Sequence, residues 1–122
     1  MGNQTTSKVL ATTVCKALAD KRGKDIIALY VREKTDLCDY FVIASGTSNT
    51  HVRALADEVE EEMRKLGVEP DHIEGRATGW ILIDYGTVIV HIFQHQDREY
   101  YNLERLWADA QVVDLSDVVT PE

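Results

Sequence analysis

The sequence predicts an α/β fold in which a mixed five-stranded sheet is flanked by helices. Apolar residues recur with helical spacing in three segments, and runs of β-forming residues lie between these segments, bounded by turn residues. The predicted order is helix, two strands, helix, three strands and helix, an arrangement of layers around one sheet. A chain of 122 residues suits one domain, so we expect a single domain over 1–122, with its core over about 8–110 and an acidic tail over 111–122.

The first helix is expected over residues 5 to 21, where Leu10, Val14 and Leu18 recur at helical spacing. Gly23 should end this helix. The run DIIALYVRE follows, and its β-branched and aromatic residues predict the first strand. A polar loop should lead from this strand into the next one.

The second helix has the clearest local signal. An apolar strand from Tyr40 to Ala44 leads through a glycine turn to a helix that should begin at Ser48 or Asn49. Gly67 should close the helix in the left-handed conformation that follows many helices. The apolar stripe of this helix consists of Val52, Leu55, Ala56, Val59, Met63 and Leu66.

The second half of the chain changes period. From Asp71 onward the apolar pattern has a period of two, which predicts strands at 72 to 76, 80 to 85 and 87 to 93. The segment QDREYYNLERLWADA returns to helical spacing and predicts a last helix. The residues beyond Ala110 either add the end of a strand or stay loose.

The hairpin over residues 79 to 93 has one unusual side. Strand alternation should turn one set of aliphatic side chains towards the helices and a mixed aromatic and polar set the other way. A tryptophan ringed by carboxylates and a histidine suits a protein interface, whereas a covering segment would make the same tryptophan a core residue. The mixed set is Trp80, Leu82, Asp84, Ile89, His91 and Phe93, and the aliphatic set is Ile81, Ile83, Val88, Val90 and Ile92.

Charge bears on the class of partner. The net charge is −8, from 21 acidic and 13 basic residues, and such a surface repels nucleic-acid phosphates. The same charge attracts a basic protein, so we expect no direct nucleic-acid binding as the main contact. The apolar runs are too short to cross a membrane, and the first residues do not have the pattern of a presequence. Cys15 and Cys38 lie in unrelated sequence contexts, so no disulfide or metal pair is expected. We therefore expect a soluble cytoplasmic protein with reduced thiols and no membrane association.

The turn over Gly46 to Thr50 admits two interpretations. Backbone N–H groups at a helix N-terminus can hold a phosphate, but the same residues are those that cap any helix. A strand followed by Gly and Ser or Thr is also typical of nucleotidyltransferases, which need two carboxylates on one side of a nearby strand. Here Asp57 and Glu58 are adjacent on the helix and point in different directions, so the catalytic pair is missing.

Other catalytic or metal sites have little support in the sequence. His91 and His95 lie four residues apart at the end of a strand, where the zinc geometry of a helix does not apply. Neither cysteine has a histidine fixed nearby, and no nucleophile elbow is present. We expect no enzyme activity, no cofactor and no metal; a nucleotide-binding or nucleotidyl-transferring enzyme that uses the Gly46 to Thr50 turn is the alternative.

The stretches TDLCDYFVIASGTSNTHVRALADEVEEEMRKLG and EGRATGWILIDYGTVIVHIFQHQDREYYNLERLWADA closely resemble the ribosomal silencing factor family, also called the Iojap-like family. The similarity runs from about Lys8 to Ala110 and includes the D-x-F-V-I-x-x-G-T-S turn, the W-x-x-x-D-x-G-x-x-x-V-H hairpin and the Y-x-L-E-x-L-W helix. The resemblance implies a nucleotidyltransferase-like core without its catalytic carboxylates. It also implies a factor that reduces translation when nutrients are scarce.

The resemblance further implies a partner and a binding site. The partner would be the large ribosomal subunit, contacted through its basic protein number fourteen on the face that meets the small subunit, so that subunit joining is blocked. A weak homodimer is a further alternative under the same resemblance. Trp80 would be the interface tryptophan, and Asp84 and Tyr85 would lie in its contact strand. Glu74, Tyr40 and Asp39 would neighbour it, and Arg98 and Tyr101 occupy motif positions of the family. The implied contact residues are Trp80, Asp84, Tyr85, Glu74, Asp39, Tyr40, Arg98 and Tyr101.

Overall fold

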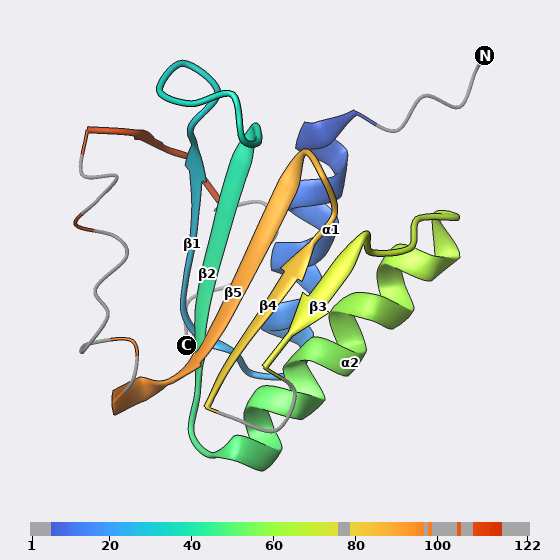
Figure 1. The fold of residues 1–122 in the computed structure, drawn as a ribbon. Coiled ribbons are helices and arrows are strands. Elements are labelled where there is room, and N and C mark those ends of the chain that lie inside the picture. The colour runs from blue at the N-terminus through green and yellow to red at the C-terminus, as the bar shows by residue number, and fades with distance from the viewer. Residues whose placement is uncertain (1–5, 76–78, 97, 99–104, 106–108, 116–122) are drawn as a thin grey trace.

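A mixed sheet with two helices against it forms the described part of the protein (Figure 1). The computed structural model describes residues 6–75, 79–96, 98, 105 and 109–115. The helices are α1 (Ser7–Asp20) and α2 (Asn49–Lys65), and the strands are β1 (Lys24–Tyr30), β2 (Tyr40–Gly46), β3 (His72–Glu74), β4 (Trp80–Asp84), β5 (Val88–Gln94) and β6 (Gln111–Val112). The predicted α/β class and the mixed sheet are confirmed.

The strand order across the sheet is β3-β4-β5-β2-β1-β6. The central pair, β2 with β5, is parallel, and the other neighbours are antiparallel. The described sheet has six strands instead of the expected five, because Gln111 and Val112 at the start of the expected tail pair with Tyr30 and Leu29 of β1. A two-residue strand has no periodicity of its own, so the pattern could not separate it from a loose end.

The helix boundaries follow the capping signals. The Oγ of Ser48 accepts a hydrogen bond from the backbone N–H of His51 at 3.1 Å, which makes Ser48 the N-cap of α2, as predicted. Gly67 follows the C-cap of α2 with a φ of 78°, the left-handed conformation predicted for it. At the end of α1, by contrast, the left-handed residue is Arg22, with a φ of 63°, rather than Gly23.

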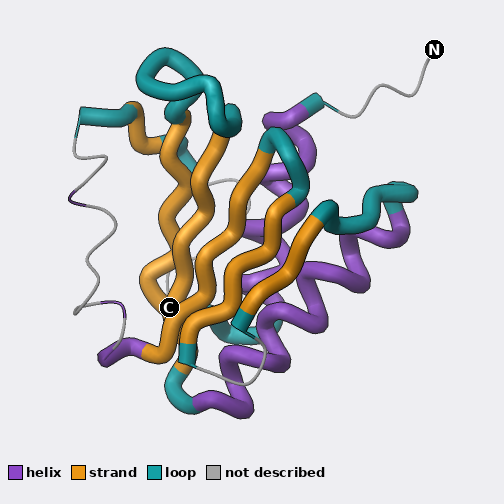
Figure 2. Tube along the Cα trace, viewed as in Figure 1, coloured by secondary structure: helices purple, strands orange, loops and turns teal. Residues whose placement is uncertain are grey.

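Both described helices lie on the same side of the sheet (Figure 2). The core between helices and sheet includes the predicted apolar stripe of α2 and the predicted aliphatic set of the hairpin. Leu66 is the exception in the stripe, because it is the C-cap of α2 and is 42% exposed. Each of these hairpin side chains is completely buried, which confirms the predicted alternation. The hairpin members of this core are Ile81, Ile83, Val88, Val90 and Ile92.

A smaller apolar cluster lies on the opposite side of the sheet. It contains the fully buried Ile43 and Phe93 together with Phe41, and Trp80 and Ile89 pack against it while half-buried. The sheet therefore has apolar side chains on both faces, although the described helices cover only one of them. This second face is where the mixed set of the hairpin lies.

Most of the predicted last helix lies outside the described residues. His95, Gln96 and Arg98 at its start, and Arg105 further on, are helical where the structure describes them. In the part of the chain that can be described, no helix is long and apolar enough to cross a membrane.

Candidate functional interface

Trp80 begins β4 on the side of the sheet away from α1 and α2. Its register partner on β5 is Phe93, and the two rings stack with centroids 4.9 Å apart and an angle of 25°. The indole Nε1–H donates a hydrogen bond to Nδ1 of His91 at 3.2 Å. The indole is half-buried and held by these two neighbours, so its orientation is set before any partner binds.

His91 is the buried acceptor that orients the indole. Burial lowers its pKa from 6.5 to about 4, so the imidazole is neutral at pH 7. A neutral ring carries a proton on one nitrogen only, and the bond from Trp80 requires that Nδ1 be the unprotonated one. His91 therefore has a structural role.

Side chains of β3, β4 and β5 share one side of the sheet, which we call the Trp80 face and which includes the buried His91 and Phe93. Across β3 and β4, Glu74 lies opposite Leu82 and His72 opposite Asp84, so the side chains of β3 at these positions share the side of Trp80. Sequence reasoning missed His72, although the alternation in HIE contained the signal. The Trp80 face consists of His72, Glu74, Trp80, Leu82, Asp84, Ile89, His91 and Phe93.

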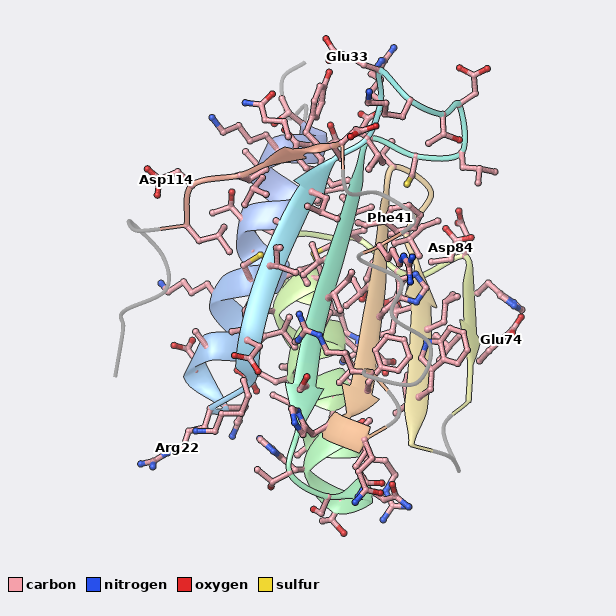
Figure 3. All side chains as sticks on the ribbon, turned by 90° about the vertical axis from the view of Figure 1, so that its left-hand side faces the viewer. Arg22, Glu33, Phe41, Glu74, Asp84 and Asp114 are labelled. Atoms are coloured by element: carbon pink, nitrogen blue, oxygen red, sulfur yellow. The ribbon has the colours of Figure 1, made fainter. Side chains whose placement is uncertain are left out.

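Carboxylates lie along two borders of the Trp80 face (Figure 3). Glu74 is exposed on β3 at the edge of the described sheet, where its carboxylate contacts the imidazole of His72. Asp84 ends β4, and its Oδ1 accepts a hydrogen bond from the backbone N–H of Gly86 at 2.7 Å. The structure thus places the predicted Glu74 and Asp84 on the same side of the sheet as Trp80.

Asp39 adjoins the Asp84 end of this face. Its backbone N–H donates to the carbonyl of Thr87 in the turn between β4 and β5, at 2.8 Å. Its carboxylate pairs with Arg32 at 3.2 Å. Burial, followed by the negative charges of Asp39 and Asp84, raises the pKa of the Cys38 thiol to about 11. Both carboxylates are therefore close to Cys38 and mark one acidic end of the surface.

Tyr40 and Tyr85, which the resemblance includes among the contact residues, lie on the other side of the sheet from Trp80. Both belong to the core between sheet and helices and are more than nine-tenths buried. Tyr40 precedes Val42 in the alternation of β2, and its ring lies 5.3 Å from that of Tyr30. The Tyr85 hydroxyl is buried, with no hydrogen-bond partner among the described residues. Strand alternation predicts that both side chains face the helices, whereas only the family resemblance implies that they contact a partner.

Arg98 is also an internal residue and not an exposed contact. It is buried, and its Nη1 donates to the backbone carbonyl of Asp25 at 2.7 Å and to Oγ of Ser45 at 2.9 Å. These bonds tie the segment after β5 to β1 and β2. Of the remaining predicted contact residues, Tyr101 lies outside the described residues.

The turn from Gly46 to Thr50 uses its polar groups to begin α2. The backbone N–H of Thr47 donates a hydrogen bond to Nδ1 of His51 at 2.9 Å. The Nε2–H of His51 in turn donates to the backbone carbonyl of Lys21 at 2.9 Å. A Cβ on Gly46 would lie 2.9 Å from Cγ2 of Val52, so the glycine permits close helix packing. These contacts favour the capping interpretation over a phosphate site. Within the described ranges, no group of three His, Cys, Asp or Glu side chains is placed to hold a metal ion.

Comparison with known proteins gives consistent matches over most of the chain. The sequence profile of the family described as "Ribosomal silencing factor during starvation" matches residues 4–122. The ribosomal silencing factor RsfS of Bacillus subtilis is 39% identical over 114 residues, which cover 93% of this chain and 94% of the relative. The mouse protein named mitochondrial assembly of ribosomal large subunit protein 1 is 32% identical over 113 residues, covering 86% of this chain and 50% of the relative.

A solved structure supports the same grouping. The crystal structure of a protein from Chromobacterium violaceum superposes with a TM-score of 0.82 at 36% identity, and covers 84% of this chain and 87% of that one. The fold described above is therefore similar to that of a protein related in sequence.

Replacement of Tyr85 by Phe tests its position in the core. Removal of a buried hydroxyl that has no partner among the described residues should leave the free energy of unfolding unchanged or raise it by up to about 1 kcal/mol. Urea denaturation of both proteins at pH 7 measures the difference. A loss of more than about 1 kcal/mol would show that the hydroxyl makes a favourable bond in the folded protein.

The pKa of His91 predicts a loss of stability in acid. The unfolded chain binds a proton near pH 6.5, but folded His91 does so only near pH 4. The free energy of unfolding should therefore fall as the pH drops from 6.5 to 4, by about 3 kcal/mol from this group. Urea denaturation at pH 7, 6, 5 and 4 measures this pH dependence. It should be lost in His91→Gln, which retains an acceptor for Trp80. It should be kept in His72→Gln, because His72 is exposed. If the free energy of unfolding depended on pH in the same way in both variants, His91 would not be the group responsible.

Proposed function

Because the chain belongs to the ribosomal silencing factor family, we propose that it binds the large ribosomal subunit through the Trp80 face and prevents that subunit from joining the small one. The proposed contact is the basic protein number fourteen of the large subunit, and the outcome is less translation when nutrients are scarce. The name of the family and the name of the mouse relative, which refers to the ribosomal large subunit, both support a ribosomal partner. The proposal places the protein in the cytoplasm.

The observation that carries the proposal is the position of a half-buried tryptophan among acidic side chains. Tryptophan is enriched at the centres of interfaces, where its large ring can be enclosed by a partner. Here Phe93 and His91 already hold the ring, so little conformational entropy is lost on binding. Glu74 and Asp84 on the same side of the sheet complement a basic partner.

The mechanism requires only that the bound protein occupy space. A folded chain of this length has a radius of gyration of about 14 Å, which corresponds to a body roughly 35 Å across. Two subunits cannot come into contact where a body of that size covers the joining face of one of them. No catalytic step is needed, which agrees with the use of the Gly46 to Thr50 turn in capping α2.

Long-range charge contributes mainly to the rate of encounter. A net charge of −8 attracts a basic surface over a distance set by the ionic strength, about 8 Å at physiological salt. Charge steering raises the association rate more than it slows dissociation. The apolar contact of Trp80 should therefore control the lifetime of the complex, and the acids its rate of formation.

Replacement of Trp80 by Ala should weaken binding to purified large subunits by tens of fold. This corresponds to about 2 kcal/mol, a typical loss for an interface tryptophan. Sedimentation through sucrose gradients with titrated protein measures the binding. Trp80→Phe retains the stacking on Phe93 and should keep most of the affinity, and thermal melts of both variants would detect unfolding.

Two results would count against the proposal. Equal co-sedimentation of Trp80→Ala and the original protein would remove the Trp80 face as the binding site. Failure of the original protein to reduce the association of purified subunits, measured by light scattering, would remove the block of joining. Pairing of the Trp80 face with a second copy would instead appear as a concentration-dependent mass in scattering of the protein alone, lost in Trp80→Ala.

Replacement of Asp84 by Asn should reduce the salt dependence of binding. The amide oxygen can still accept the bond from Gly86, so only the charge is lost. Affinity should fall several-fold at 50 mM salt, with a smaller difference at 0.5 M, where screening is strong. Asp57→Asn serves as the control, because it makes the same change of charge at an exposed position of α2, on the opposite side of the sheet from Trp80. Equal effects of the two variants would show that only net charge matters.

A further inference from the structure

The loop between β1 and β2 is held in one conformation by its own hydrogen bonds. The backbone N–H of Val31 donates to the carbonyl of Asp39 at 2.8 Å and so closes the base of the loop. The Val31 carbonyl accepts bonds from the N–H groups of Lys34, at 2.8 Å, and Thr35, at 3.0 Å. The N–H of Leu37 donates to Oγ1 of Thr35 at 3.1 Å. The loop is therefore ordered without help from a partner.

This ordered loop presents a leucine to solvent. Leu37 is 70% exposed, the largest value among the exposed large apolar side chains of the described residues. The next residue, Cys38, is buried in the same apolar cluster as Phe41 and Phe93, so the backbone on this side of Leu37 is anchored. A single exposed leucine is common on protein surfaces. Because hydrogen bonds already fix the backbone of this loop, however, little conformational entropy would be lost if a partner bound Leu37.

The loop adjoins the acidic end of the Trp80 face. In Figure 3 the loop, marked by Glu33, lies at the same end of the sheet as Asp84. The bond from the Asp39 N–H to the Thr87 carbonyl joins the loop to the turn between β4 and β5. Asp36 precedes Leu37 in the sequence, and the carboxylates of Asp39 and Asp84 lie near the thiol of Cys38, which follows it.

We propose that Leu37 is a second apolar anchor of the ribosomal interface, and that it enters an apolar depression rimmed by lysine or arginine side chains on the basic protein that Trp80 contacts. The inference rests on the proposed function. Trp80 and Asp84 stand at opposite ends of β4, about 13 Å apart for a strand of this length. One interface of standard size, about 800 Å² per partner and so roughly 30 Å across, covers both ends.

The test compares substitutions of Leu37 with the same substitutions of Leu66. Leu66 is 42% exposed and follows α2 on the helix side of the molecule, so it lies away from the proposed interface. Leu37→Ala should weaken binding to purified large subunits by about tenfold, the effect of one apolar side chain no longer enclosed. Leu37→Lys should weaken it further, because its charge faces a basic rim. Melting temperatures of the Leu37 variants should match the original, because the side chain is exposed.

The outcomes separate this inference from the proposed function. Weaker binding by both Leu37 variants, with Leu66→Ala and Leu66→Lys within about twofold of the original protein, supports the anchor. Leu37 variants that bind like the Leu66 variants, while Trp80→Ala binds weakly, overturn the anchor and leave the proposed function standing. Absence of binding by the unsubstituted protein overturns both.

Discussion

The parallel pairing of β2 with β5 is the constraint on which the rest of the structure depends. All seven residues of β2 are buried, and all of them pair in sequence with residues of β5. A slip of one residue would turn Val42 away from the helices and Phe41 into them, so both apolar clusters select the same register. This register of β5 makes His91 and Phe93 point away from the helices. Trp80 points the same way, because it is the register partner of Phe93 on β4.

Local pattern predicts most of this arrangement, and long-range contacts explain what it misses. The alternation of the hairpin separates its two sides correctly, because each strand carries that information in its own sequence. Arg98 shows the limit, since its bonds reach residues 73 and 53 positions away and no local pattern indicates them. For Tyr40 and Tyr85 the local alternation is a better guide to burial than their place in a family motif.

The bond between Trp80 and His91 links the stability of the fold to the shape of the proposed interface. A buried imidazole without charge serves as an acceptor for the indole, and its desolvation is what keeps it neutral at pH 7. Ring stacking on Phe93 holds the same indole from another direction. A tryptophan fixed in this way offers a partner apolar area more than hydrogen bonding, because the bond from Nε1 is already formed inside the chain.

The three carboxylates near the Trp80 face are not equivalent towards a basic partner. Asp39 is paired with Arg32, so an incoming cation must compete with a cation that is already present. Glu74 contacts the imidazole of His72, which competes as a cation only when it is protonated. Asp84 instead accepts a bond from the backbone N–H of Gly86, which orients its carboxylate without neutralising the charge. An oriented carboxylate with its full charge gives a basic side chain the strongest attraction for the least rearrangement. Asp84 should therefore contribute more to electrostatic recognition than Asp39, although both count equally in the net charge.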